Sequence, residues 1–136
     1  MQLKYNSDQR KEYLNMIDRI GQNWLAVFQG NTEFYSAAYW DLLTRIWKYE
    51  GPVRKTDAMK FMTGIKSAQT AGKYLETAIQ NRFLLEEDNP QDARSKLVVL
   101  SRDMRDRLDE FFDLAVGEVQ RTNQSIFEKG AVTEKI

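Results

Sequence analysis

The residues whose types and spacing are best suited to binding a ligand lie between residues 66 and 83, where polar and apolar side chains recur at the period of an α-helix. Ser67 can cap this helix by accepting a hydrogen bond from the backbone N–H of Gln69 or Thr70. At about 100° per residue, one helix face has no apolar residue and carries these side chains: Lys66, Gln69, Thr70, Lys73 and Thr77. The opposite face is expected to be buried: Ala68, Ala71, Leu75, Ala78, Ile79 and Phe83. The polar face offers donors and positive charge to an acidic, acceptor-rich ligand.

A β-hairpin is predicted directly after this helix. Residues 83–85 and 96–100 are predicted to be short strands, apolar apart from Lys96, and residues 86–95 between them are charged and turn-forming. Val53 is expected to add a short strand to the same sheet. A short helix, a polar helix and a hairpin in this order are the layout of a winged helix-turn-helix DNA-binding head. The hairpin side chains with the charge to contact or position such a ligand are Arg82, Asp92, Arg94 and Lys96.

This stretch resembles the multiple-antibiotic-resistance regulator (MarR) family of bacterial transcription factors. The family's wing pattern, Asp-x-Arg followed six residues later by Leu-Thr, is present as Asp92-Ala93-Arg94 and Leu100-Ser101. The phrase Ser67-x-x-Thr70-Ala71-x-Lys73-Tyr74-Leu75 is similar to the start of that family's recognition helix. The similarity is strongest over residues 53–101, and helix order extends it over nearly the whole chain. Two features depart from the family pattern: Ser101 replaces Thr, and the wing carries the additional acids Glu86, Glu87 and Asp88.

The resemblance implies contacts with double-stranded DNA. An α-helix fits the major groove, where Gln69 suits adenine, Lys66 and Lys73 suit guanine or phosphate, and Ser67, Thr70 and Thr77 complete the polar face. Arg94 is implied to enter the minor groove, with Asp92 holding its guanidinium. The alternatives are a merely solubilising Arg94 and an ordinary turn residue at Asp92. Arg82 and Lys96 are expected to contact phosphates.

The implied fold is mainly α with a small β-hairpin, as one winged helix domain over residues 1–136. Residues 33–100 form the DNA-reading head, and residues 1–32 and 101–130 form dimerisation helices. Within these parts, periodicity predicts helices at residues 7–29, 33–49 and 56–63, the last capped by Thr56. A long helix is predicted after Ser101, with a frayed tail from residue 130 onward.

The first and last helices have apolar stripes that are too rich for one small reading head to bury. In the resembled family both chain ends pack against a symmetry mate, so a homodimer is implied, acting as a repressor on a pseudo-palindromic operator. The alternative is that the two helices pack only within one chain. The predicted interface consists of Leu14, Ile17, Trp24, Leu108, Phe111, Phe112, Ala115 and Val119.

A small-molecule effector is a further expectation from the resemblance, because family members often bind a ligand near the junction of their dimerisation and reading parts. Ten of the sixteen aromatic residues lie within the first fifty residues. The candidate pocket lining is Trp24, Phe28, Trp40 and Trp47. The alternative is that these aromatic side chains belong to the hydrophobic core.

Composition argues against several other classes of protein. The absence of Cys and His removes thiol-based redox sensing, most transition-metal sites and His-dependent catalysis. No phosphate-binding loop, nucleophile elbow or dinucleotide motif is present, so no enzymatic activity, cofactor or metal is expected. No apolar run approaches membrane-spanning length, and the N-terminus lacks a secretion signal. We therefore expect no membrane segment and a cytoplasmic location.

The charge distribution leaves a second hypothesis open. The net charge is zero, yet residues 54–74 hold five Lys or Arg against one Asp. This local excess favours nucleic acid, although it is weaker than the charge of a strongly basic domain. A winged helix adaptor that binds protein and not DNA is the alternative, and it is favoured by the neutral net charge and the acidic wing. Retention on heparin or random DNA at low salt separates the two.

Overall fold

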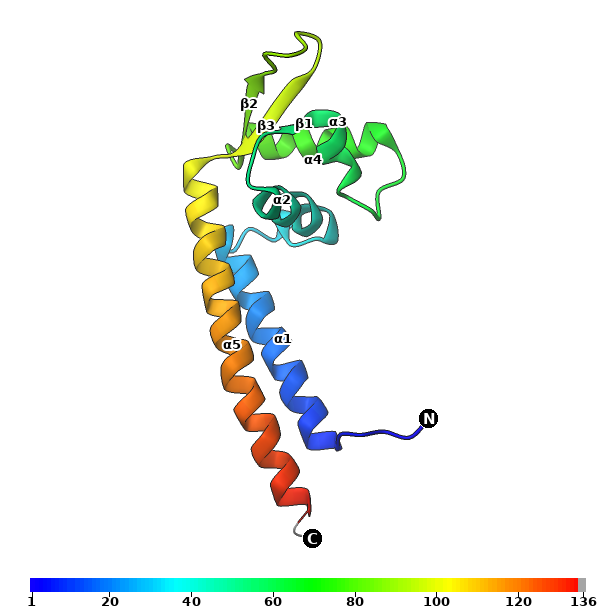
Figure 1. The fold of residues 1–136 in the computed structure, drawn as a ribbon, viewed down its shortest axis with the longest axis vertical. Helices are drawn as coiled ribbons and strands as arrows, with labels where there is room; N and C mark the ends of the chain where they lie inside the picture. The colour runs from blue at the N-terminus through cyan, green and yellow to red at the C-terminus, as the bar shows by residue number, and fades with distance from the viewer. Residues whose placement is uncertain (135–136) are drawn as a thin grey trace. The chain divides into compact units, whose positions relative to one another are not determined.

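The computed structural model describes residues 1–134, with side chains through residue 131. It divides into two compact units: Met1–Gly30 with the chain from Glu110 onward, and Asn31–Asp109. The fold is mainly helical with one small antiparallel sheet, so the predicted fold class is confirmed (Figure 1). The elements in chain order are α1 (Ser7–Val27), the 3₁₀ helix η1 (Thr32–Phe34), α2 (Ala37–Tyr49), β1 (Val53–Arg54), α3 (Lys55–Lys60), α4 (Ala68–Gln80), β2 (Leu84–Asp88), β3 (Lys96–Leu100) and α5 (Arg102–Glu134).

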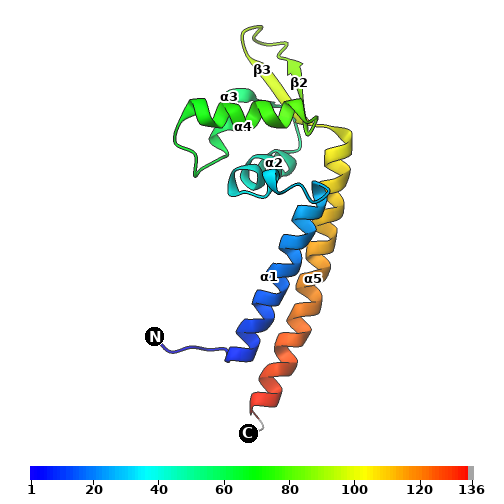
Figure 2. The same cartoon turned by 180° about the vertical axis from the view of Figure 1, so that it is seen from behind.

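The unit Asn31–Asp109 contains a three-stranded antiparallel sheet in the order β1-β3-β2. Val53 of β1 pairs with Val98, which confirms the expected extra strand, and Leu84 of β2 pairs with Leu100. The β2–β3 hairpin extends beyond α4 in both views (Figures 1 and 2). The core of this unit includes the fully buried side chains Leu42, Leu43, Ile46, Leu75, Leu84 and Val98.

Aromatic rings connect α4 to the preceding elements of this unit. The ring of Tyr39 on α2 meets the ring of Tyr74 on α4 edge-on, with centroids 5.0 Å apart. Phe34 makes similar edge contacts with Tyr39 at 5.0 Å and with Phe83 at 4.8 Å. Edge-to-face pairs stabilise packing beyond the area that they bury. The rings therefore contact the middle of α4 at Tyr74 and the chain just after its end at Phe83.

Four predicted boundaries are corrected by the structure. The second helix starts at Ala37 rather than residue 33, because the hydroxyl of Ser36 caps it by accepting from the Tyr39 N–H at 3.3 Å. Residue Thr56 lies inside α3 and does not cap it. Strand β2 continues to Asp88, where a cross-strand ion pair with Lys96 supports the extra pairing. Helix α5 continues to Glu134, so of the expected frayed tail only residues 135 and 136 lie outside the described residues.

The other unit contains α1 and the later part of α5, which lie side by side along their lengths (Figures 1 and 2). Helix α1 begins with a capping box in which Asn6 and Gln9 satisfy each other's backbone N–H groups. Trp24 on α1 lies edge-on to Phe111 on α5, with ring centroids 5.3 Å apart. These two aromatic side chains are buried within a single chain.

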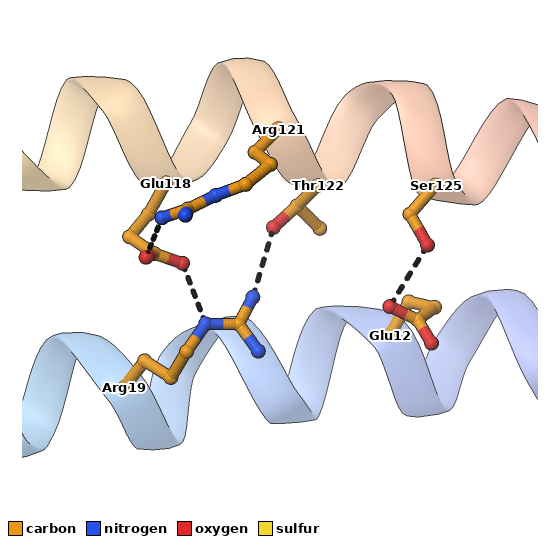
Figure 3. A network of polar contacts seen from close by, with 6 residues as sticks. All are labelled: Glu12, Arg19, Glu118, Arg121, Thr122 and Ser125. Carbon is orange, nitrogen blue, oxygen red and sulfur yellow. Dashed lines mark hydrogen bonds and ion pairs between the residues drawn. The ribbon is translucent and has the colours of Figure 1, made fainter.

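Polar contacts also join the two helices of this unit (Figure 3). The guanidinium of Arg19 on α1 donates to the Glu118 carboxylate at 2.6 Å and to the Thr122 hydroxyl at 3.4 Å. Glu118 is only 6% exposed, and Arg121 also pairs with it. Near the start of α1, the Glu12 carboxylate accepts from the Ser125 hydroxyl at 3.0 Å. Each buried polar group shown therefore has a partner from the facing helix.

Within the described residues, no helix is long and apolar enough to cross a membrane.

Candidate nucleic-acid interface

Helix α4 has the amphipathic form that the sequence predicts. The Ser67 hydroxyl accepts from the Thr70 N–H at 3.3 Å, which confirms the predicted N-cap. The side chains expected to face the core do so at Ala71, Leu75 and Ala78. The prediction that Ala68 is buried is wrong, because a helical side chain leans toward the N-terminus and the first one extends past the packed turns.

The polar face of α4 is open to solvent over its first two turns. The exposed residues of this face lie in the helix or directly before it: Lys66, Ser67, Gln69, Thr70 and Lys73. Neither Lys66 nor Lys73 has an ion-pair partner within residues 1–134. Their ammonium groups therefore remain available to an external anion.

Thr77 differs from the other residues of the predicted polar face. It is half-buried, and its side chain hydrogen-bonds with the hydroxyl of Tyr39. Burial raises the pKa of Tyr39, and the hydrogen bond with Thr77 opposes that shift only in part. Thr77 is therefore less open to an external ligand than the exposed residues of the polar face.

The tip of the hairpin is shaped by two successive turns. The Asn89 side chain accepts from the Gln91 N–H at 3.0 Å, and the Asp92 side chain accepts from the Arg94 N–H at 3.0 Å. The Asp92 carbonyl also accepts from the Ser95 N–H at 3.0 Å. Asparagine and aspartate form such turns because their short side chains reach the backbone two residues on. Asp92 therefore fixes the backbone that carries Arg94.

Arg94 projects from this tip with a side chain that is 93% exposed. Its Nε lies 3.6 Å from Asp92 Oδ1, so the carboxylate lies next to the guanidinium as well as bonding the backbone. Arg82, which is also exposed, occupies the turn between α4 and β2 with φ of 61°. The two arginines lie at opposite ends of strand β2, one beyond its start and one beyond its end.

Two acids of the wing, Glu86 and Asp88, have partners within the fold that the sequence did not indicate. Asp88 pairs with Lys96 directly across the hairpin. A hydrogen bond from Lys96 holds the pKa of Asp88 below its ordinary value, and the same contact raises the pKa of Lys96. Lys96 is therefore engaged by a carboxylate, unlike Lys66 and Lys73.

Lys55, the first residue of α3, was not predicted to have any functional role. Its Nζ donates to Glu76 of α4 at 2.7 Å and to Glu86 of β2 at 2.6 Å. Burial lowers the pKa of Lys55, but the hydrogen bonds with the two carboxylates outweigh it and raise the pKa overall. The partners lie 21 and 31 residues further along the chain, so no local pattern identifies the contact.

The predicted dimer residues fall into two groups. Trp24, Leu108 and Phe111 are buried within the single chain, with exposures of 5%, 0% and 2%, which corrects their assignment to a partner-facing surface. Phe111 also meets the ring of its neighbour Phe112 edge-on, with ring centroids 5.1 Å apart. The remaining members are exposed or half-buried: Leu14, Ile17, Phe112, Ala115 and Val119.

The predicted effector-pocket residues are divided between the two units. Trp24 and Phe28 are buried in the α1–α5 unit, where their rings meet edge-on at 5.0 Å. Trp40 and Trp47 belong to the other unit, and Trp47 donates from Nε1 to Asp109 at 2.7 Å. A separate hollow of ≈ 780 Å³ lies in the α1–α5 unit. Its lining includes Tyr5, Tyr13, Asn123, Ile126 and Phe127.

Comparison with known proteins gives matches at the level of structure. No protein-family model matches the sequence, and no curated protein matches it. The chain is similar to a mutant of MepR from S. aureus bound to an oligodeoxyribonucleotide, with TM-score 0.67, 14% identity and coverage of 98% of this chain and 96% of that one. It is also similar to a mutant MarR from E. coli complexed with operator DNA, with TM-score 0.54, 14% identity and coverage of 93% and 84%.

A third similar structure is AbsC, a MarR family transcriptional regulator from Streptomyces coelicolor, with TM-score 0.55, 13% identity and coverage of 90% and 82%. Identities this low establish a shared fold. The chain therefore has the winged helix fold of the MarR-family transcription regulators, as the sequence resemblance predicts.

Proposed function

We propose that this protein is a sequence-specific transcription regulator that binds double-stranded DNA. The observation that carries the proposal is one arrangement: an exposed polar helix face with the cations Lys66 and Lys73, which have no ion-pair partner among the described residues, followed by a hairpin whose tip presents Arg94. A helix of this kind enters the major groove, and an arginine on an adjoining wing suits the negative potential of a narrow minor groove. Two structures of similar fold are bound to DNA, which supports DNA as the partner of this chain.

The contacts divide by role. Gln69 has the amide geometry for an adenine edge, and Thr70 suits a phosphate or a thymine methyl group. Lys66, Lys73 and Arg82 supply charge to phosphates, which positions the protein without reading sequence. Lys96 contributes less to DNA binding than predicted from its charge, because Asp88 already neutralises it.

The regulator acts as a homodimer and as a repressor under this proposal. Exposed apolar side chains on both helices of the α1–α5 unit support self-association: Tyr13, Leu14, Ile17, Leu114, Val116, Val119 and Phe127. Two reading heads held about 34–36 Å apart would match a pseudo-palindromic operator. A small-molecule effector that changes this spacing is part of the same proposal.

The test is selection of bound sequences from a random duplex pool, followed by titration of the selected site against a scrambled duplex. We expect an enriched pseudo-palindromic site and affinity that falls as salt rises. The rival is a protein-binding adaptor, which the acids of β2 favour. No retention on heparin or random DNA at low salt, together with no enriched sequence, would establish the adaptor instead.

A further inference from the structure

Lys55 joins three elements that surround the proposed DNA-binding surface. It begins α3, and its ammonium bonds one carboxylate on the reading helix and one on the wing strand. Glu76 lies on α4 one turn before that helix ends, and Glu86 lies in β2 opposite Val98. A single side chain therefore links α3, the reading helix and the wing within one compact unit.

The position of Lys55 indicates that these contacts, rather than local helix preference, hold it in place. The N-terminus of a helix carries partial positive charge and disfavours a cation there. The side chain of Lys55 is also only 24% exposed, so its ammonium loses part of its hydration. Two carboxylates within 2.7 Å offset both costs. Removal of Lys55 would leave Glu76 and Glu86 facing each other as like charges.

We propose that Lys55 is a positioning residue that sets the wing relative to the reading helix, and that it does not contact phosphate. This inference rests on the proposed DNA binding for its functional consequence. The ammonium group of Lys55 is already paired with two carboxylates. Lys73, in contrast, has no such partner among the described residues. Arg94 and the face of α4 can contact one duplex together only if the wing keeps its place.

The geometric part of the inference can be tested without DNA. The sequence has no Cys, so spin labels can be placed uniquely through Ala68→Cys at the start of α4 and Ala93→Cys at the wing tip, both exposed. We expect Lys55→Met to broaden or shift the label-to-label distance distribution and Lys55→Arg to preserve it. The double variant Glu76→Gln with Glu86→Gln should broaden it too, which covers the case in which Lys55→Met fails to fold. An unchanged distribution in these variants would overturn the proposal.

The functional part uses affinity and salt dependence on the selected duplex. Lys55→Met should weaken binding by about three- to tenfold with an unchanged salt slope, whereas loss of a phosphate contact lowers the slope by about 0.9. The Glu76→Gln and Glu86→Gln double variant distinguishes a positioning role from a simple charge effect. If charge alone mattered, removal of two acids near DNA would tighten binding, whereas a positioning role predicts weaker binding. Tighter binding, or a reduced slope in Lys55→Met, would refute the positioning role. If wild-type protein binds no duplex, the proposed function fails while the spin-label result still decides the geometry.

Discussion

Arg94 and Asp92 interact with each other at the wing tip through both backbone and side chain. The Asp92 carboxylate bonds the backbone N–H of Arg94 and lies 3.6 Å from the Arg94 guanidinium, so one side chain shapes both the turn and the direction of the arginine. An exposed ion pair of this kind contributes little to stability. Under the proposed function, its role is to restrict where the guanidinium points before DNA binds.

We predict that Arg94→Ala weakens specific DNA binding by about 1–3 kcal/mol and leaves the fold intact, because the side chain is exposed and packs against nothing that the core needs. Fluorescence anisotropy with the selected duplex measures the affinity, and circular dichroism reports the fold. Asp92→Asn is the matched control. It keeps the acceptor for the Arg94 N–H but loses the ion pair, so its effect should be smaller. Wild-type affinity in Arg94→Ala would remove the wing from the interface.

Lys73 and Gln69 are predicted to differ in what they contribute on α4. Lys73→Ala should weaken binding on all duplexes alike and lower the salt slope by about 0.9, because one phosphate contact is lost. Gln69→Ala should change the preference at one base position with little effect on the slope. Titrations at several salt concentrations, with the selected site and single-base variants, measure both. Two variants with wild-type slopes and wild-type preferences would show that α4 is not the reading helix.

The sequence was sufficient to identify most of these side chains and insufficient for their partners. Exposure of Lys66, Gln69 and Lys73 follows from helical periodicity alone. The engagement of Lys55, by contrast, depends on how β2 and α4 come together, which no local pattern encodes. The half-burial of Thr77 was not predictable for a related reason: it depends on the tertiary contact with Tyr39.

At the scale of elements, the start of a helix was predicted correctly where the right capping side chain was identified. Ser67 was identified and the start of its helix is correct, whereas Ser36 was overlooked and the second helix was begun too early, and Thr56 was taken as a cap that it does not form. The acids at the end of β2 were assigned to a turn because charge is unusual in strands. The cross-strand pair of Asp88 and Lys96 explains why the strand nevertheless continues.

The packing of α1 against α5 is predicted to weaken in acid through Glu12. Hydrogen bonds from Lys129 and Ser125 lower the pKa of Glu12 from the ordinary value of 4.5. A lowered folded pKa means that the unfolded chain binds more protons, so this stabilisation is present above pH 4.5 and is lost as pH falls through the folded value.

Urea unfolding at neutral and acidic pH should show a larger loss of stability for wild type than for Glu12→Gln. Asp88→Asn serves as a second reference, since Asp88 also has a lowered pKa but lies in the other unit. Equal losses in wild type and Glu12→Gln would contradict the assignment.

At the scale of the whole molecule, an apolar stripe on a long helix can pack within its own chain or against a second subunit. Sequence periodicity does not distinguish these two roles. Phe111 and Val119 both belong to the stripe on α5, yet Phe111 is 2% exposed and Val119 is 53% exposed. The first packs on Trp24 within the chain, so a charged substitution there would unfold the protein and say nothing about a dimer. Only the exposed members of the stripe can test self-association.

Leu14→Glu combined with Val119→Glu is therefore the informative variant for the homodimer. Both side chains are more than half exposed, at 57% and 53%, so new carboxylates there leave the core of one chain undisturbed. A symmetric interface buries each substituted residue twice, which places four unpaired charges in the dimer contact and should separate the subunits. Light scattering at micromolar concentration should give twice 16.0 kDa for wild type and 16.0 kDa for the variant, with unchanged circular dichroism.

The exposed Asn15, on the same helix, provides Asn15→Glu as the charge control, which should stay dimeric. DNA affinity should fall with the dimer, because one reading head keeps half of the contacts. A wild-type mass of a single chain would refute the dimer, and a variant that stays dimeric would place the interface on another surface.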